Sequence, residues 1–394
     1  MNSPVASSGG IARSLAVVIT AMFMVNANYG LSIPLLANNL SRMGASDTMV
    51  GLSTAAQALP VLFIAPFAQR LMAALSPARI MGICIAMAAL ALLLFPIFRD
   101  PWAWFPLRCL LGASANLLWI SGETWINSLA TEQRRGRIVS LYGMASSGGF
   151  AAGPLVLFLT GTEGWAPFLA GSALMLSALL TLGLARHVPR DFASDRPVRI
   201  SLLMWLWPVP FLLNFLFAGS VEALASFFSL LGVRLGLEEA STFALLAVLG
   251  IGSLLMQYPF GWLADHVDRK RLLITVIVLV IGGTLVLPWV LRAGLGVAFP
   301  FMIVYGGLLS TLYPMGVVLL GERFRGGELV AASAGFTMMW AMGFAVGPPV
   351  AGFFYDIFDT PGLIFSIAGF LAAFLLAVPF VWKRKPTDKV DVRE

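Results

Sequence analysis

Apolar runs of about 20 residues recur along nearly the whole of this 394-residue chain and constrain its fold more than any other feature. A helix of that length rises about 1.5 Å per residue and crosses the roughly 30 Å hydrocarbon layer of a bilayer. The composition agrees, since 59% of the residues are hydrophobic, 11% are charged, and the mean hydropathy is +0.89. Soluble domains do not have this balance. We therefore expect an all-α integral membrane protein with no separate soluble domain.

Charged breaks and Pro/Gly clusters divide the chain into about twelve predicted spans. They lie near residues 14–40, 48–69, 78–98, 102–130, 138–160, 165–186, 201–233, 241–263, 272–291, 296–320, 329–354 and 361–382. No basic region precedes the first apolar run, which has full span length and is therefore expected to be retained rather than cleaved as a signal peptide. An even number of spans puts both termini on one side.

The Lys and Arg residues between the predicted spans are strongly biased to one side. Twenty of the 25 lie on the face that holds both termini, four lie on the other face, and one lies inside a span. Because basic loops stay in the cytoplasm, we expect a multi-pass protein of the inner (plasma) membrane with both termini cytoplasmic. The basic residues form short clusters rather than one continuous patch, which argues against nucleic-acid binding.

The two halves of the chain resemble each other on either side of a polar connection. We predict a six-helix half at residues 1–190, a cytoplasmic linker at 191–200, and a second six-helix half at 201–394 that ends in a short basic tail. Short motifs recur at offsets of 190 to 194 residues: Pro66-Phe67-Ala68 with Pro259-Phe260-Gly261, Arg42-Met43-Gly44 with Arg234-Leu235-Gly236, 132–136 with 322–326, and Gly153-Pro154 with Gly347-Pro348. Parallel repeats of this kind are typical of transporters that work by alternating access.

The stretch GWLADHVDRKR at residues 261–271 resembles the loop signature of the major facilitator superfamily, with Asp268 where a glycine is usual. The matching first-half stretch, residues 65–71, has no aspartate. The resemblance extends over essentially the whole chain, is to the twelve-helix bacterial drug-exporter-like branch, and implies two pseudo-symmetric six-helix bundles. The residues expected to form a cytoplasmic gate are Gly261, Asp265, Arg269, Arg323 and Arg325. The alternative is a solvated turn whose charges only set topology.

A second motif resembles the fourth helix of proton-coupled drug exporters in this superfamily. It consists of Arg108 and Gly112, although Leu111 replaces the glutamine often found before the glycine. At about 100° per residue, Arg108, Trp119 and Glu123 share one helix face. The alternative is that Arg108 extends its charged end from the outer end of the span to the interface.

A third motif resembles the Gly-rich, Pro-containing fifth helix associated with antiporters. It occurs as GFAAGP at residues 149–154 and again as GFAVGPP at residues 343–349. Small residues let helices approach closely, and such packing is also common in any helical bundle. The residues expected to pack helices are Gly149, Gly153, Pro154, Gly343, Gly347 and Pro348.

Of the 19 acidic residues, only Glu123 and Glu222 fall well inside predicted spans, one in each half. A charge at membrane depth costs about 2.5–3.5 kcal/mol and usually faces a bundle interior or a wet cavity. A buried glutamate exposed in turn to two faces can load and release a proton. We expect Glu222 to bind a proton or a cationic substrate, and Glu123 to act in coupling or in an inner gate, with Arg108 as a third proton-coupling candidate. The alternative for each glutamate is a role in helix packing alone.

Further polar side chains inside the predicted spans need partners in lipid, so each lines a substrate cavity or pairs across helices. These candidates are Asn26, Asn28, Gln57, Asn116, Asn214, Gln257 and Tyr313. The two cysteines and two histidines form no ligand set for a metal, and no phosphate-binding glycine loop is present. We therefore expect no metal, no cofactor and no ATP drive.

Taken together, the resemblance and these residues predict a secondary active transporter, not an enzyme, that exports amphipathic or hydrophobic compounds in exchange for protons. One alternative is a proton symporter for uptake of a nutrient or metabolite. Another is a transporter-like membrane sensor or scaffold. The expected partners are a small-molecule substrate, protons and the lipid bilayer, without nucleic acid, and nothing in the sequence requires more than a monomer.

Overall fold

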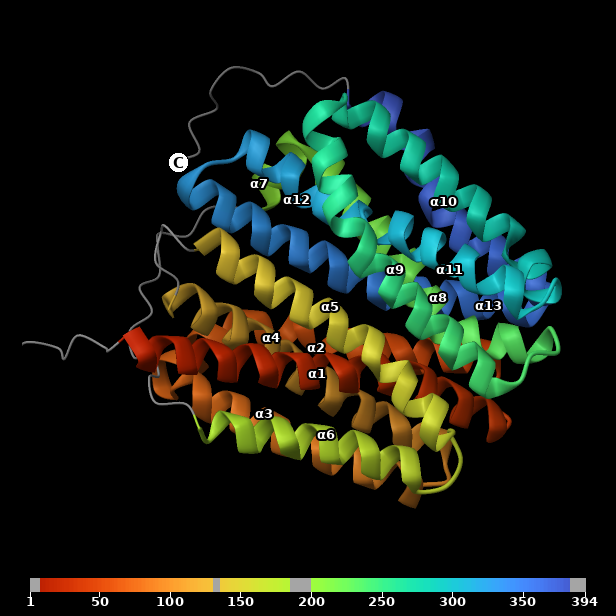
Figure 1. Cartoon of the computed structure of the whole chain (residues 1–394), viewed down its shortest axis with the longest axis horizontal. Helices are drawn as coiled ribbons and strands as arrows, with labels where there is room; N and C mark the ends of the chain where they lie inside the picture. Colours follow the sequence, from red (N-terminus) through yellow and green to blue (C-terminus); the bar gives the residue numbers. More distant parts are fainter. Residues whose placement is uncertain (1–7, 130–134, 185–199, 383–394) are drawn as a thin grey trace, which may run out of the picture. The chain divides into compact units, whose positions relative to one another are not determined.

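The computed structural model describes residues 8–129, 135–184 and 200–382, and all regular structure in these ranges is helical (Figure 1). In chain order the elements are α1 (Ser8–Arg42), α2 (Asp47–Ala74), α3 (Pro77–Leu94), η1 (Phe95–Ile97), η2 (Pro101–Ala103), α4 (Trp104–Leu129), α5 (Arg135–Thr160), α6 (Ala166–Leu182), α7 (Ile200–Leu206), α8 (Pro208–Arg234), α9 (Glu239–His266), α10 (Arg269–Arg292), α11 (Leu295–Ser310), α12 (Leu312–Arg323) and α13 (Gly326–Val381).

Nine helical segments among the described residues are long and apolar enough to cross a membrane. Helix α6 is apolar but has only 17 residues. Helix α13 joins two helices at Asp359, whose φ of 53° is positive. With α2 and α6 added and α13 divided at Asp359, the helices follow the twelve predicted spans. The predicted all-α membrane fold is confirmed.

Two predicted spans contain a break that the hydropathy pattern does not show. Helices α7 and α8 form one predicted span but separate at Trp207, which has a φ of −140° and a ψ of 73°. The proline that follows, Pro208, disfavours the helical conformation for the residue before it. Helices α11 and α12 separate at Thr311, three residues before Pro314. Because Pro314 has no N–H, it cannot continue the helical hydrogen-bond pattern.

The helices fall into two compact units. The first unit comprises Met1–Met43 and Leu59–Ala193, and within it α1 packs on α5 and α6 while α3 packs on α4 and α6. The second unit comprises Gly44–Ala58 and Ser194–Glu394, and within it α8 packs on α13, α9 on α11, and α10 on α11 and α13. The first half predicted from sequence includes residues 44–58, whereas the contacts of these residues group them with the second unit.

Glycines allow one helix pair in each unit to approach to backbone contact. A Cβ atom on Gly153 of α5 would lie 2.4 Å from the carbonyl oxygen of Ala27 in α1. A Cβ atom on Gly347 of α13 would lie 2.2 Å from the carbonyl oxygen of Gly219 in α8. No side chain fits at either position without moving a helix. The two units therefore use related glycines for equivalent helix contacts.

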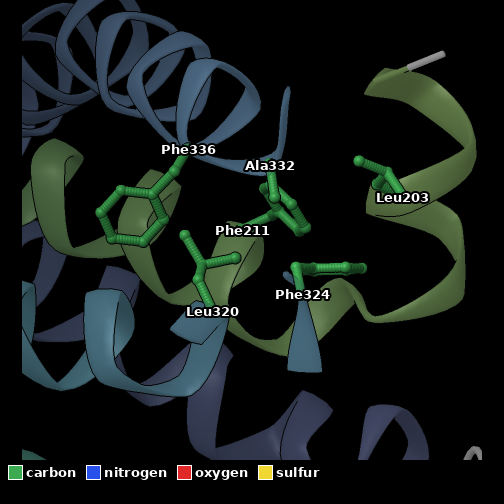
Figure 2. Close-up of a cluster of buried hydrophobic side chains, with 6 residues drawn as sticks. All are labelled: Leu203, Phe211, Leu320, Phe324, Ala332 and Phe336. Carbon is green, nitrogen blue, oxygen red and sulfur yellow. The ribbon is translucent and has the colours of Figure 1, made fainter. Parts of the chain in front are cut away.

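A cluster of buried apolar side chains joins four helices of the second unit (Figure 2). Its members come from α7, α8, the end of α12 with the residue after it, and α13: Leu203, Phe211, Leu320, Phe324, Ala332 and Phe336. Leu320 and Ala332, on either side of the α12–α13 connection, are almost completely buried in it. The cluster thus holds the short helix α7 and this connection against α8.

Candidate functional site

Glu222 is buried in the middle of α8, with 4% of its surface exposed. No hydrogen-bond partner for its Oε2 atom is found in the described part of the chain. An isolated carboxylate in an apolar environment is costly unless it gains a proton or a positively charged partner. The carboxyl group of Glu222 therefore has the chemistry of a site that takes up a proton or a cation.

Two buried polar side chains follow Glu222 on the same side of α8. Ser226 and Ser229 lie within about 60° of Glu222 around the helix, because they follow it by one and two turns. Both serines are completely buried. The Ser226 hydroxyl donates to the Glu222 backbone carbonyl at 2.7 Å, and the Ser229 and Thr242 hydroxyls are 2.9 Å apart, which links α8 to α9. A stripe of buried polar groups thus extends along α8 from Glu222.

Glu123 differs from Glu222 in both exposure and contacts. Its side chain is exposed near the end of α4, and one of its oxygens, Oε1, accepts a hydrogen bond of 2.8 Å from the Trp119 indole nitrogen one turn earlier. Trp119 is 38% exposed, and its ring packs edge-to-face on Tyr142 of α5. An indole and a carboxylate side by side can contact a cation through the ring face and the negative charge.

Arg108 is completely buried in α4. Tyr29 of α1 lies near enough for electrostatic interaction with its guanidinium group. A side chain extended to a membrane interface would keep its charged end in water. The burial of Arg108 therefore disagrees with that alternative and is compatible with a role inside the first unit.

The candidate cavity residues of the first unit are less alike than the sequence suggested. Asn26 donates from its amide to the Met22 carbonyl in the same helix at 2.8 Å. Asn28 is buried, and its Oδ1 atom lies beside Gly171 of α6, where a Cβ would approach it to 3.0 Å. Asn116 is half-buried in α4.

In the second unit the structure brings two of the candidates together around Phe336 of α13. Asn214 of α8 is buried and donates to the Phe336 carbonyl at 2.6 Å, so it pairs across helices. Tyr313 of α12 is 39% exposed, and its ring lies 5.3 Å from that of Phe336 and 5.6 Å from that of Trp340. Gln57 is buried in the first part of α2, while the side chain of Gln257 lies outside the described residues.

The predicted gate residues lie around the α9–α10 connection and the end of α12. Gly261 has open space where a Cβ would be, and the side chain of Asp265 lies outside the described residues. Arg269 forms an ion pair with Glu322. Glu322 was not among the predicted gate residues, although it belongs to the repeated stretch 322–326. Arg323 and Arg325 are exposed.

The remaining predicted packing residues lie at the same close helix contacts. A Cβ on Gly149 would be 2.2 Å from the Phe23 carbonyl oxygen of α1, and one on Gly343 would be 2.1 Å from the Phe215 carbonyl oxygen of α8. Pro154 lies within α5, one residue after Gly153. Pro348 lies within α13. Its carbonyl oxygen would be 2.2 Å from a Cβ on Gly51 of α2.

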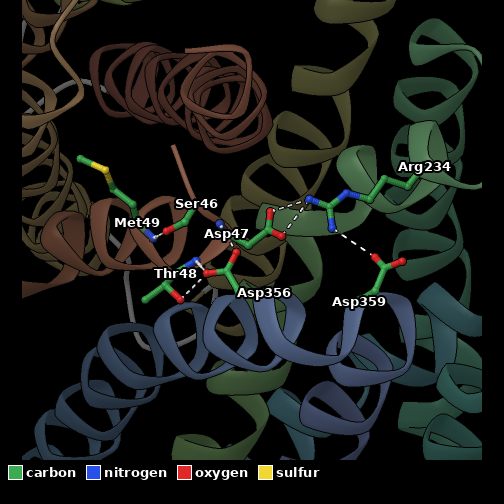
Figure 3. Close-up of polar contacts among 7 residues, drawn as sticks. All are labelled: Ser46, Asp47, Thr48, Met49, Arg234, Asp356 and Asp359. Carbon is green, nitrogen blue, oxygen red and sulfur yellow. Dashed lines mark hydrogen bonds and ion pairs between the residues drawn. The ribbon is translucent and has the colours of Figure 1, made fainter. Parts of the chain in front are cut away.

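A polar cluster that the sequence analysis missed lies in the second unit around Arg234, the last residue of α8 (Figure 3). The Nη2 atom of Arg234 donates to both carboxylate oxygens of Asp47, at 3.0 and 2.8 Å. Its Nη1 atom donates to Asp359 at 3.3 Å, and its guanidinium carbon lies 4.0 Å from the ring centre of Tyr355. Arg234 therefore joins α8, α2 and the break in α13.

The same cluster satisfies the first backbone N–H groups of α2. The N–H groups of Asp47 and Thr48 each donate to the Asp356 carboxylate at 2.8 Å, and the Thr48 hydroxyl donates to it as well (Figure 3). The first N–H groups of a helix have no partner within that helix, and a negative charge at this end is stabilising. Asp356 of α13 thus caps α2 from another helix.

Burial raises the pKa of Asp47 above its ordinary value, and the hydrogen bonds and charge of Arg234 offset this only in part. The side chain of Asp47 is 5% exposed, whereas that of Arg234 is 39% exposed.

The motif at Arg42 recurs in the sequence at Arg234, and this repeat pointed to the region. The partners of Arg234 could not be predicted from it. Arg42 contacts Thr162 at 2.6 Å and Glu163 at 3.7 Å, both within the first unit.

The chain is similar to known proteins along nearly all of its length. A model of the Major Facilitator Superfamily matches residues 15–289 and 210–394. YfkF of Bacillus subtilis (strain 168), an uncharacterized MFS-type transporter, is 25% identical over 363 residues, which are 89% of this chain and 90% of YfkF.

Solved structures share the fold. The nucleoside transporter NupG has a TM-score of 0.77 at 16% identity, covering 94% of this chain and 99% of NupG. A D-xylose-proton symporter has a TM-score of 0.76 at 16% identity, covering 96% of this chain and 98% of the symporter. The family match, the two helical units and the membrane-spanning helices lead to one conclusion: this chain is a multi-pass membrane protein that belongs to the Major Facilitator Superfamily.

Proposed function

We propose that this chain is a secondary active transporter that moves a small solute by alternating access and exports amphipathic or hydrophobic compounds in exchange for protons. The burial of Glu222 in α8, with Oε2 lacking a partner among the described residues, carries this proposal. A carboxyl group at membrane depth is a functional site by default, because its cost has to be offset by a bound proton or cation. Glu222 is the proposed proton-binding residue.

We assign Glu123 and Trp119 to binding of the solute rather than to binding of the proton. Both side chains are exposed, and the indole donates to the carboxylate. An aromatic face next to a carboxylate suits an amphipathic compound with a positive charge. We propose that the buried Arg108, in the first unit, affects the coupling between proton movement and solute movement.

The direction of export is supported by sequence resemblance to proton-coupled exporters at residues 108–112 and to antiporters at residues 149–154 and 343–349. The bias of Lys and Arg residues supports an inner-membrane orientation with both termini in the cytoplasm. In that orientation the Arg269–Glu322 pair lies on the cytoplasmic side and is a candidate part of the gate with Asp265, Arg323 and Arg325.

A second candidate function is uptake of a polar nutrient with protons. The likeness of this fold to a D-xylose-proton symporter and to a nucleoside transporter favours it. The two functions differ in the direction of solute flux under an imposed pH gradient. A membrane sensor would move no solute in either direction.

The experiment that tests this function measures the internal pH of proteoliposomes that contain the purified protein and are held under an imposed pH gradient. Lipophilic cations, sugars, nucleosides, amino acids and organic acids are added in turn. We expect a lipophilic cation to trigger proton flux that Glu222→Gln abolishes and that Glu123→Gln weakens by raising the solute concentration needed. The matched control is Glu163→Gln, because the Glu163 side chain is 82% exposed in a connection between helices.

Three results would contradict the proposal. Proton flux triggered only by a sugar or nucleoside, in the direction of uptake, would favour the symporter. Full proton-coupled flux in Glu222→Gln would exclude Glu222 as the proton site. Absence of counterflow for every radiolabelled solute, from protein that is monodisperse and folded, would favour the sensor.

A further inference from the structure

Two aromatic side chains of the second unit keep contact with solvent although they pack on buried rings. Tyr313 of α12 is 39% exposed, and Trp340 of α13 is half-buried. Their rings meet edge-to-face with 5.6 Å between the ring centres. Tyr313 also contacts the buried Phe336 of α13, and Trp340 contacts the buried Phe217 of α8 edge-to-face at 5.6 Å. Buried rings from α8 and α13 therefore support the two rings that contact solvent.

Contacts from two other helices fix the position of Phe336. The amide of Asn214 in α8 donates to the Phe336 carbonyl at 2.6 Å. A Cβ on Gly316 of α12 would lie 2.7 Å from the end of the Phe336 ring, so only a glycine leaves room for that ring. Phe336 also belongs to the buried apolar cluster of the second unit (Figure 2). The surface formed by these rings is thus fixed in advance, which lowers the ordering cost of binding a ligand.

Exposed hydroxyl side chains lie on the same face of α13 as Trp340. At about 100° per residue, Ser333 lies within about 20° of Trp340 around the helix, and Thr337 within about 60°. Both side chains are exposed, and the Thr337 hydroxyl donates to the Ser333 backbone carbonyl at 3.1 Å. Polar groups inside a membrane span line a wet cavity or pair with other groups, because hydrocarbon offers them no partner. This face of α13 therefore suits contact with water and a solute better than contact with lipid.

We propose that Tyr313 and Trp340, with Ser333 and Thr337 beside them, form a ring site that binds a planar aromatic ring of the transported solute. Aromatic rings attract one another in edge-to-face and offset arrangements beyond the effect of buried area. Small-molecule sites typically combine aromatic side chains with a few polar groups, as this surface does. None of the four side chains carries a charge, so the surface suits an uncharged part of the solute. The ring site rests on the proposed function, because it names a group of the transported solute, but not on the coupling ion or the direction of flux.

The experiment compares two cations of equal charge that differ in one ring. Phenyltrimethylammonium carries a planar aromatic ring, whereas cyclohexyltrimethylammonium carries a puckered saturated ring of similar size. Equilibrium dialysis measures the binding of each compound to the purified protein in nanodiscs, without a pH gradient. We expect the wild type to bind the phenyl compound about two- to tenfold more tightly, which is the range for an aromatic pair beyond its buried area.

Substitutions of the two exposed rings should change this preference selectively. Tyr313→Leu and Trp340→Leu should each bring the affinities for the two compounds close to each other by weakening binding of the phenyl compound. Unchanged binding of the cyclohexyl compound would show that the variants are folded. Tyr313→Phe keeps the ring and should retain the preference. Tyr258→Leu is the matched control, because Tyr258 is an 82% exposed tyrosine on α9 of the same unit, and it should also retain the preference.

The ring site is excluded if the wild type binds both compounds equally, or if neither leucine substitution at Tyr313 or Trp340 lowers the preference. Loss of the preference in Tyr258→Leu to the same extent would also exclude it. These results are distinct from those of the flux experiment. Selective binding of the phenyl compound without proton flux would support the ring site and contradict proton-coupled export, whereas proton flux with equal binding of the two compounds would do the reverse.

Discussion

Arg234 at the end of α8 binds both carboxylate oxygens of Asp47, 187 residues earlier in the chain, at 3.0 and 2.8 Å. The two partners are unequally buried, since the Asp47 side chain is 5% exposed and that of Arg234 is 39% exposed. The interaction therefore matters most for Asp47, whose charge has little access to water. The unequal burial therefore predicts how substitution of either residue, and a change of pH, affects the stability of the folded protein.

Removal of Arg234 should destabilise the protein more than removal of the charge on Asp47. Arg234→Gln leaves a buried carboxylate without its cation, at a cost of about 1–3 kcal/mol, whereas Asp47→Asn removes the charge that needs that cation. The thermal unfolding midpoints of the two purified variants, measured in the same detergent, show which variant loses more stability. In the Arg234→Gln background, Asp47→Asn should restore part of the lost stability. A larger loss for Asp47→Asn alone would contradict this account.

The raised pKa of the Asp47 carboxyl group should make the folded state more stable at low pH than at neutral pH. Burial holds the Asp47 pKa above its ordinary value of 3.8, so the folded state binds the proton more tightly than the unfolded state does. This contribution is fully present below 3.8 and is lost as the pH rises through the pKa of folded Asp47.

The wild type should therefore gain stability relative to Asp47→Asn as the pH falls from about 7 toward about 4. Arg234, Asp356, Asp359 and Tyr355 surround the site in both proteins, so their own titration largely cancels in the difference. The midpoint of thermal unfolding of both proteins across this range provides the measurement. A wild type that loses stability relative to the variant on acidification would reverse the predicted sign.

The close helix contacts should not tolerate an added methyl group. Gly347→Ala would put a Cβ 2.2 Å from the Gly219 carbonyl oxygen and force α8 and α13 apart, at a cost of about 1–3 kcal/mol. Gly369→Ala in the second part of α13, after Asp359, is the control, because a Cβ there meets nothing within 4 Å. Gly347→Ala should unfold at a lower temperature than Gly369→Ala, and equal unfolding midpoints would refute the packing role of Gly347.

The Trp119 indole should act on solute binding through Glu123. Trp119→Phe removes the N–H that donates to Glu123 but keeps a ring to pack on Tyr142. For a solute that triggers proton flux, we expect the half-saturating concentration to change by about two- to tenfold. The same substitution in the Glu123→Gln background should have little further effect. Additive effects of the two substitutions would show that the indole and the carboxylate act separately.

The sequence was sufficient to predict the class of fold and the family, because hydropathy is a local property that repeats with every span. It also pointed to Glu222 and to the glycines of α5 and α13, because carboxylates and small residues are conspicuous in apolar helices. The roles of these residues stay predictions. The sequence assigned the two glutamates different roles but could not show that one is buried and the other exposed, since both are single acids in apolar runs.

The tertiary structure decided which polar groups meet. It buried Glu222 within α8 and left Glu123 exposed beside Trp119. It also grouped the first part of α2 with the second unit. Asp47 and Arg234 looked like charges of ordinary connections, because nothing near either residue in the chain identifies its partner. Apolar spans follow from the free energy of each segment in lipid, whereas an ion pair depends on the contact of helices far apart in sequence, which only the folded chain specifies.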